Sequence, residues 1–265
     1  MAELERARPL LTIVMPAFDE GDVLDAVIRE LFEATDRLPG GEDSRVIVVD
    51  DGSTDDTREV LERLAAVESR LSYRRHSTNR GFGAAVRTAI EAASTPYVLM
   101  IPADGQWDPS ELPAFYEAAV DDVTLAVGVR DGRSVYGWKR RLLSVVYSLL
   151  LRVMFHPKCP DLAWVHLYDL RVVDWRTPRS TSPFYPVEIA LWNLATRIPA
   201  SGFRQLPSGM RRRAKGRTKV ANARVMWVMT RDLVSCSRRV RRERRARRTA
   251  SRAVAEDRVD GEGAA

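Results

Sequence analysis

Hydrophobic and polar positions follow two different patterns along the first 130 residues. Short apolar runs with the length of buried strands are separated by segments in which apolar residues recur every three or four positions, as on one face of a helix. The predicted strands are residues 10–15, 45–49, 71–75, 97–101 and 123–129, and the predicted helices are residues 19–32, 54–67, 81–93 and 110–120. Strands that alternate with helices predict an α/β fold with a doubly wound, mostly parallel sheet.

Beyond residue 130 this alternation weakens. The remaining pattern predicts helices at residues 142–155, 187–196 and 220–248, a short strand at residues 164–173 and an edge strand at residues 203–213. The last dozen residues are small and polar, a composition that favours disorder. We therefore expect a globular domain over residues 1–219, an amphipathic, basic helical tail over residues 220–252 and a disordered C-terminus over residues 253–265.

Polar side chains follow three of the predicted strands at the point where each strand ends. They are Asp19, Glu20, Asp50, Asp51, Asp104 and Gln106. The carboxyl ends of parallel strands share one edge of a sheet, where ligands bind in open α/β folds. Helix capping by Ser53 and ordinary turn formation are the alternative explanations. A shared ligand at one edge explains all three strand ends together, and the oxygen atoms suit a hard cation or a sugar nucleotide.

The segment NRGFGAAV, residues 79–86, places two glycines before a predicted helix. Such a helix start can present backbone amides to an anion. The match to a dinucleotide fingerprint is partial, because Val86 stands where the third glycine belongs. A helix capped near Asn79 is the simpler interpretation.

Length and composition restrict the class of protein. A chain of 265 residues with 45% apolar residues can form one large α/β domain or two small ones. Two cysteines and three histidines without ligand spacing predict neither a disulfide framework nor a zinc site. The charged N-terminus lacks the apolar core of a signal peptide, and no run approaches the roughly 20 apolar residues of a membrane span. These features favour a cytoplasmic protein.

The net charge of +6 conceals a strong asymmetry. Residues 211–252 hold 17 Arg or Lys against Asp232 and Glu243, which gives +15 and leaves −9 for the rest of the chain. The run RRVRRERRARR, residues 238–248, could bind nucleic acid, bind anionic lipid or form a solvated helix end. The acidic body and the lack of interleaved aromatic residues disfavour nucleic acid.

Four segments together resemble a known family. PAFDE (residues 16–20), VVDDGSTDDT (residues 48–57), NRGFGAAV and PADGQWDP (residues 102–109), in this order and spacing, resemble the inverting family-2 glycosyltransferases of GT-A fold. The most similar branch is that of the dolichyl- or polyprenyl-phosphate mannosyltransferases. The resemblance is specific over residues 10–130 and looser to about residue 220. It includes VGVR (residues 127–130), CPDLAWVHLY (residues 159–168) and RRAKGRTK (residues 212–219), which is similar to the family's basic closing loop.

The resemblance implies roles for individual residues. Pro16, Phe18, Glu20, Asp50, Asp51 and Ala103 would hold the nucleotide; Asp104 and Gln106 would ligate Mg²⁺ or Mn²⁺; Arg130, Arg213 and Lys219 would contact phosphates; Asp104, Arg130 and Asp161 would be catalytic. A departing diphosphate gains negative charge, which a divalent ion and arginines stabilise. Pro102, Phe18 and His166 replace the family's Asp, Tyr and Lys. Pro102 implies weaker metal binding or, alternatively, an inactive homologue.

The expected function is transfer of one sugar, with inversion, from a nucleotide donor to a polyprenyl phosphate. A hydroxyl of a polysaccharide or secondary metabolite is the alternative acceptor, and it would need a carboxylate such as Asp161 as a base. A catalytically inactive nucleotide-sugar-binding or membrane-associated partner protein is the alternative from another class. The expected partners are the donor, a lipid phosphate and, through the basic tail, the cytoplasmic face of a membrane.

Overall fold

The computed structural model describes residues 10–130, 149, 151, 153–155, 159, 161–212 and 223–262. The strands are β1 (Leu11–Ala17), β2 (Arg45–Asp50), β3 (Leu71–Arg75), β4 (Tyr97–Met100), β5 (Leu125–Arg130), β6 (His166–Asp169) and β7 (Phe203–Ser208). The α-helices are α1 (Gly21–Thr35), α2 (Thr57–Ala65), α3 (Phe82–Ala92), α4 (Leu112–Val120), α6 (Tyr185–Thr196) and α7 (Ala223–Glu262). Short 3-10 turns are η1 (Gly41–Asp43), η2 (Pro109–Glu111) and η3 (Ala200–Gly202).

The described strands form one sheet in the order β3-β2-β1-β4-β6-β5-β7. All neighbouring pairs are parallel except those of β6, which runs antiparallel between β4 and β5. Tyr168 of β6 lies opposite Val98 of β4 on one side and Leu125 of β5 on the other. The predicted α/β fold with a mostly parallel sheet is confirmed, and β7 is an edge strand as expected. The strand predicted at residues 164–173 is shorter than expected.

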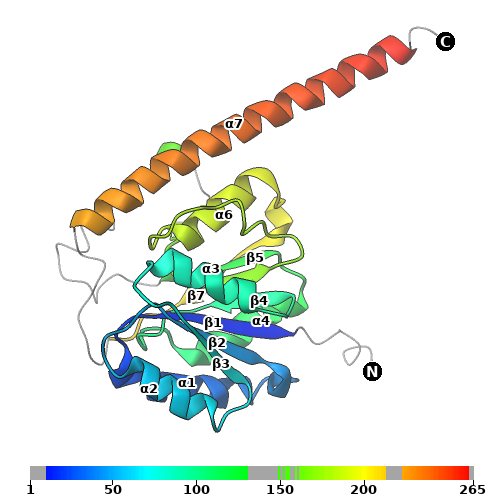
Figure 1. Cartoon of the computed structure of the whole chain (residues 1–265). Coiled ribbons are helices and arrows are strands. Elements are labelled where there is room, and N and C mark those ends of the chain that lie inside the picture. Colours follow the sequence, from blue (N-terminus) through cyan, green and yellow to red (C-terminus); the bar gives the residue numbers. More distant parts are fainter. Residues whose placement is uncertain are drawn as a thin grey trace, which may run out of the picture.

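Helices cover both faces of the sheet (Figure 1). One core joins α1, α2 and α4 to the strand residues that point to their side, among them Ile13, Val48 and Leu99. The other core joins α3, α6 and α7 to the alternate strand residues, among them Val14 and Val98. Successive side chains of a strand point to opposite faces, so each buried strand feeds both cores.

The helix α7 lies across α6 and extends beyond the body of the molecule (Figure 1). Its inner face carries Met229, Leu233, Cys236 and Val240, all buried at helical spacing in the core that α6 shares. The first half of the segment predicted as a basic tail therefore packs on the sheet domain. The helix also continues to Glu262, past residue 252, where the sequence predicts disorder. The division of the chain at residue 219 stays a prediction.

Two predicted helix caps are wrong. The residue before α2 is Asp56 rather than Ser53, and the hydroxyl of Ser53 instead accepts the backbone N–H of Asp19 at 2.9 Å. The residue before α3 is Gly81 rather than Asn79, at a positive φ of 97°. Both capping positions fail because the loops there are held by carboxylates from neighbouring strands.

None of the helices among the described residues is long and apolar enough to span a membrane. Of the helix predicted at residues 142–155, the structure describes Leu149, Leu151 and residues 153–155, all in helical conformation.

Candidate active site

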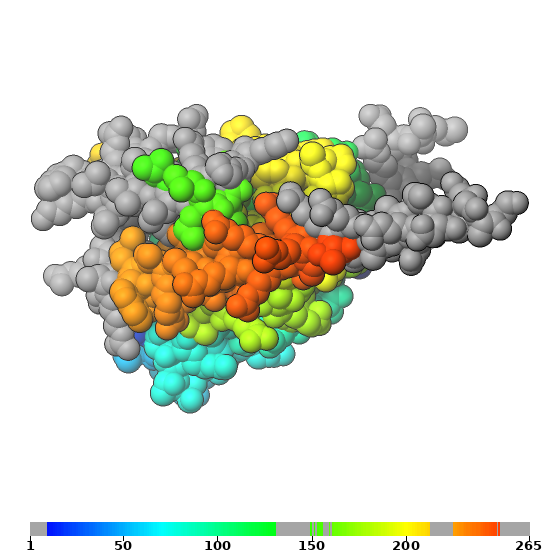
Figure 2. Space-filling view, turned by 90° about the horizontal axis from the view of Figure 1, so that it is seen from above, coloured from blue at the N-terminus to red at the C-terminus, as the bar shows by residue number. Residues whose placement is uncertain are grey.

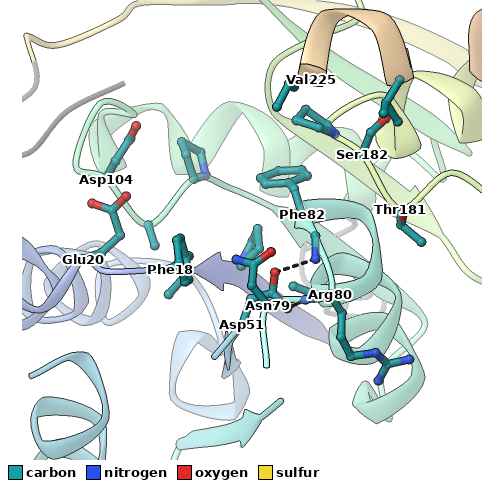
Figure 3. Close-up of a pocket in the computed structure, with 18 of the residues that line it drawn as sticks. Phe18, Glu20, Asp51, Asn79, Arg80, Phe82, Asp104, Thr181, Ser182 and Val225 are labelled. Carbon is teal, nitrogen blue, oxygen red and sulfur yellow. Dashed lines mark hydrogen bonds between the residues drawn. The ribbon is translucent and has the colours of Figure 1, made fainter. Parts of the chain in front are cut away.

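A pocket of about 670 Å³ opens at the carboxyl ends of β1, β2 and β4, three strands that are adjacent in the sheet. From the sequence-predicted set the pocket is lined by Pro16, Phe18, Glu20, Asp51, Ala103, Asp104 and Gln106. Phe18, Glu20, Asp51 and Asp104 surround it in Figure 3. The expectation that these strand ends meet at one site agrees with this geometry.

The loop after β1 is fixed by the loop after β2. Asp19 has a positive φ of 48°, a conformation that a non-glycine residue adopts only when its surroundings hold it. The holding contacts are the Asp19 N–H to the Ser53 hydroxyl at 2.9 Å and the Thr54 N–H to the Asp19 carboxylate at 2.8 Å. The Glu20 N–H donates to the Thr57 hydroxyl at 2.9 Å. The backbone is thus fixed while the Glu20 side chain lines the pocket.

Asp50 and Asp51 have different surroundings. Asp50 is fully buried and does not line the pocket; its Oδ1 accepts the Ser53 N–H at 2.8 Å, and its Oδ2 lies 3.1 Å from Arg75 Nε. Asp51 reaches the pocket wall, and its carboxylate contacts His76 Nδ1 at 2.6 Å. The predicted nucleotide contact of Asp50 is therefore not made at the pocket surface, because this carboxylate closes the turn after β2.

Asp51 also holds the glycine-rich start of α3. Its carboxylate accepts the N–H groups of Arg80 at 2.9 Å and Gly81 at 2.8 Å (Figure 3). The Gly83 N–H donates to the Thr181 carbonyl at 2.9 Å. These amides are occupied by protein acceptors, so they do not form the open anion cradle that the glycines suggested.

The loop after β4 carries the candidate metal ligands. Asp104 accepts the backbone N–H of Gln106 at 3.1 Å, which fixes its carboxylate at the pocket edge. Gln106 is paired through its backbone carbonyl with the N–H of Arg211 at 2.8 Å. The Arg211 guanidinium in turn binds Asp108 at 2.7 Å and Glu30 at 2.6 Å. The start of the predicted basic loop is thus attached to the site, while Arg213 and Lys219 lie outside the described residues.

The opposite wall of the pocket was predicted only in part, through the segment NRGFGAAV. It consists of Asn79, Arg80, Gly81, Phe82, Ala85, Thr181, Ser182, Pro183, Val225 and Val228. The two glycines of NRGFG were a usable signal, because Cβ atoms at Gly81 and Gly83 would lie 2.5 and 2.6 Å from the carbonyl oxygens of Thr181 and Ser180. Only glycine permits so close an approach. Nothing in the sequence indicates that the turn around Thr181 and the start of α7 would face this cavity.

Arg130 and Asp161, both predicted to be catalytic, bind each other away from the pocket wall. Arg130 Nε and Nη2 donate to the two carboxylate oxygens of Asp161 at 2.6 and 2.9 Å, and the two side chains are only 9% and 6% exposed. The guanidinium also lies over the Trp164 ring, 5.2 Å from its centre. Arg130 and Asp161 therefore form a buried ion pair that joins the end of β5 to the loop before β6.

His166 is fully buried, so it cannot take the part of a substrate-facing lysine. Its Nε2 donates to the Leu162 carbonyl at 3.0 Å, and its Nδ1 accepts the Tyr168 hydroxyl at 2.8 Å. Burial lowers the pKa of His166 to about 4, because the charged imidazolium would lose its hydration.

This pKa predicts a specific loss of stability in acid. The unfolded chain takes up a proton below pH 6.5, whereas the folded chain resists protonation until about pH 4. The contribution of His166 is therefore complete above pH 6.5 and is lost as the pH falls, by about 3 kcal/mol at most. Urea unfolding between pH 7 and 4.5 should show a steeper decline for the wild type than for His166→Gln, whose amide can keep both hydrogen bonds. Parallel curves for the two proteins would contradict the assigned pKa.

The pocket edge offers oxygen ligands for a divalent metal but no complete set. Among the described residues no group of three or more His, Cys, Asp or Glu side chains could hold an ion by itself. At the pocket edge, Glu20, Asp104 and Gln106 offer oxygen atoms. Mg²⁺ is commonly bound by one or two carboxylates together with substrate phosphates and water. The donor set fits such an ion when a phosphate-bearing ligand completes the coordination.

The charges of the pocket also indicate that a diphosphate would need an added cation. Of the described residues that line it, Glu20, Asp51 and Asp104 are acidic and Arg80 alone is cationic. In Figure 3 the guanidinium of Arg80 points away from Glu20 and Asp104. A diphosphate in this pocket would therefore need positive charge from outside the described wall, such as a metal ion or the basic segment after Arg212.

Comparison with known proteins agrees with the motifs. The family model described as Glycosyl transferase family 2 matches residues 12–167. A protein of Mycobacterium tuberculosis named as an uncharacterized glycosyltransferase is 33% identical over 228 residues, covering 80% of this chain and 90% of the relative. An undecaprenyl-phosphate 4-deoxy-4-formamido-L-arabinose transferase of Pseudomonas paraeruginosa is 27% identical over 237 residues, covering 86% of this chain and 65% of the relative.

Solved structures show the same fold. Glucosyl-3-phosphoglycerate synthase from Mycobacterium tuberculosis, in complex with Mn²⁺, UDP-glucose and phosphoglyceric acid, aligns with a TM-score of 0.67 at 18% identity, covering 86% of this chain and 80% of that one. The resemblance read from the strand-end motifs is confirmed, and so is the GT-A fold. The chain belongs to glycosyl transferase family 2.

Proposed function

We propose that this glycosyltransferase moves one sugar, with inversion, from a nucleotide sugar to a polyprenyl phosphate. The observation that carries the proposal is the division of the pocket into two unlike ends. One end is acidic, with Glu20 and Asp104, and the other carries the apolar side chains of Phe82 and Val225 (Figure 3). A charged donor and a hydrocarbon chain next to a phosphate match these two ends.

The donor belongs to the acidic end. Pro16, Phe18, Asp51 and Ala103 would hold the nucleotide, since their backbones are fixed by the loops after β1, β2 and β4. Asp104, Gln106 and Glu20 would hold Mg²⁺ or Mn²⁺ against the diphosphate. The ion, when bound, supplies the positive charge that stabilises the leaving diphosphate. The solved relative in complex with Mn²⁺ and UDP-glucose supports this arrangement.

The acceptor phosphate would attack the anomeric carbon directly. Its oxygen forms the new bond to that carbon as the bond from the carbon to the donor's β-phosphate oxygen breaks, and the nucleoside diphosphate leaves with the electron pair. An ionised phosphate needs no base. A hydroxyl acceptor would need one, and Asp161 is held by Arg130 away from the pocket wall. The position of Asp161 thus supports the proposal of a phosphate acceptor, which needs no base. Arg213 and Lys219, by family resemblance, would contact the phosphates.

The outer face of α7 suits a membrane surface. Arginines with exposed positions on it are Arg231, Arg238, Arg241, Arg242, Arg244 and Arg245. Three large apolar side chains are also exposed on this side of the molecule: Trp227 at 65%, Leu149 at 59% and Val153 at 64%. Figure 2 shows the residues 149–155 that are described lying beside α7. Cations near anionic lipid contribute about 1 kcal/mol each, and apolar side chains add to binding.

A panel of donors and acceptors tests the proposal. GDP-, UDP- and TDP-sugars with Mn²⁺ are first compared by thermal shift, because a ligand at 100 times its dissociation constant stabilises by about 2.7 kcal/mol. The bound donor is then offered undecaprenyl phosphate in anionic or neutral vesicles and, separately, 3-phosphoglycerate. We expect transfer to undecaprenyl phosphate, faster on anionic vesicles.

Each other outcome has a meaning. Transfer to 3-phosphoglycerate alone, the molecule bound in the solved relative, would replace the lipid with a small phosphorylated acceptor and, if the sugar is found on its hydroxyl, would contradict direct attack by a phosphate. Equal rates on both vesicle types would contradict the role of the α7 arginines. If neither sugar transfer nor slow hydrolysis of the donor is detected, the protein would be the inactive homologue that Pro102, in place of the family's Asp, implies as the alternative.

A further inference from the structure

The start of α7 is built into the pocket. Val225 and Val228 line the cavity, and Met229 and Leu233 are buried against the sheet domain one turn further along. Directly before Leu233 lies Asp232, an acidic side chain in a helix otherwise rich in arginine. A buried carboxylate is costly unless it is hydrogen-bonded, so Asp232 is expected to have a partner in the sheet domain.

That partner is a turn with two serines. Asp232 Oδ2 accepts the hydroxyls of Ser180 at 2.6 Å and Ser182 at 3.1 Å, and the carboxylate is only 11% exposed. Its other oxygen accepts two N–H groups of Arg231 at 3.0 and 3.2 Å. Hydrogen bonds to a charged acceptor in such a position are stronger than those between neutral groups.

The serine turn is itself a wall of the pocket. Thr181, Ser182 and Pro183 line the cavity opposite Phe18 (Figure 3). The Thr181 carbonyl accepts the Gly83 N–H, and a Cβ atom at Gly81 would come within 2.5 Å of that carbonyl. The turn is therefore pressed against the start of α3, with α7 behind it.

We propose that Asp232 is a positioning residue, which holds the turn of residues 180–183 against α3 and so sets the acceptor side of the pocket. Without the carboxylate, the hydroxyls of Ser180 and Ser182 lose their shared charged acceptor; they lie 2.8 Å apart, so one can donate to the other, but the second is left without an acceptor and the turn relaxes away from Gly83. The turn would still be retained in the fold, because the backbone N–H groups of Arg179 and Ser180 donate to Glu188 at 3.0 and 2.8 Å. The assignment of this wall to the acceptor rests on the proposed function.

The test compares three variants at positions outside the pocket lining. Asp232→Ala removes the acceptor, Asp232→Asn keeps an oxygen for the serines, and Cys236→Ala removes buried packing from the same helix without touching the turn. Two quantities are measured on folded protein: the hydrogen-exchange rate of the Gly83 amide, and the steady-state constants with whichever phosphate acceptor the wild type uses in the panel above.

We expect Asp232→Ala to raise both the Gly83 exchange rate and the KM for the acceptor about tenfold, the size expected for losing a hydrogen bond to a charged group. Donor affinity should stay at the wild-type value. Asp232→Asn should have a Gly83 exchange rate and an acceptor KM close to those of the wild type. Cys236→Ala should lower thermal stability alone. An Asp232→Ala protein that matches Cys236→Ala in both quantities would overturn the proposal. The exchange rate needs no acceptor, so it decides the matter even if the proposed function fails.

Discussion

Asp104→Asn is expected to lower the affinity for the nucleotide sugar, in the presence of Mn²⁺, by about 100-fold or more. The substitution removes the negative charge at the pocket edge while leaving the side-chain shape, and the amide oxygen can still accept the Gln106 N–H. A neutral amide is a far weaker ligand for a hard cation than a carboxylate. Calorimetric titration with and without Mn²⁺ measures the effect, because the metal-dependent part of the affinity should vanish.

Asp108→Asn is the matched control for this substitution. Asp108 lies in the same loop but outside the pocket lining, and an asparagine can still accept the Ser110 N–H. Its donor affinity should remain that of the wild type, because Arg211 keeps its backbone bond to Gln106 and its ion pair with Glu30 when the charge of Asp108 is removed. Pro102→Asp restores the carboxylate that the family usually has and should tighten metal binding. An Asp104→Asn protein with undiminished Mn²⁺ dependence would remove Asp104 from the metal site.

Asp161→Ala is expected to destabilise the folded chain by about 3–5 kcal/mol, because it removes the buried carboxylate to which Nε and Nη2 of Arg130 donate. Denaturant unfolding measures this loss directly. Arg130→Met combined with Asp161→Leu should recover most of it, since an apolar pair needs no compensating charge.

The surface pair of Arg204 and Asp121, at 2.9 Å and about 40% exposed on each side, provides the comparison. Arg204→Ala should cost no more than about 1 kcal/mol, because exposed charges remain hydrated. A small loss for Asp161→Ala, coupled with lost turnover in an otherwise stable protein, would return Asp161 to the catalytic role that family resemblance implies.

Local patterns were sufficient for much of the fold. The apolar runs that form β1, β2 and β4 are bounded by polar or turn residues, so their limits could be predicted closely. The position of β6 could not, because its antiparallel place between β4 and β5 depends on pairing across the sheet. The ion pair between Arg130 and Asp161 depends on the position of β6 beside β5, so it could not be predicted from the sequence either.

The candidate site was predictable where it depends on strand ends. Asp51 and Asp104 follow apolar runs, and the topology brings such positions to one edge. Thr181 and Ser182 carry an ordinary turn composition, which does not indicate the cavity that a turn faces. The pocket positions of Val225 and Val228 could not be predicted either, because the helical pattern does not distinguish a valine that lines a pocket from one that packs on a helix.

The order of strands in the sheet also determines the order in which the pocket can be assembled during synthesis. The strands β3, β2, β1 and β4 form one continuous half of the sheet, all from residues before 101. The other half cannot join until β6 has left the ribosome, because in the sheet of the described residues β6 lies between β4 and β5. Chains fold from the N-terminus as they emerge. The wall of the pocket that carries Phe18 and Asp51 can therefore form early, whereas the opposite wall waits for the turn at Thr181 and for the start of α7, which follow later in the chain.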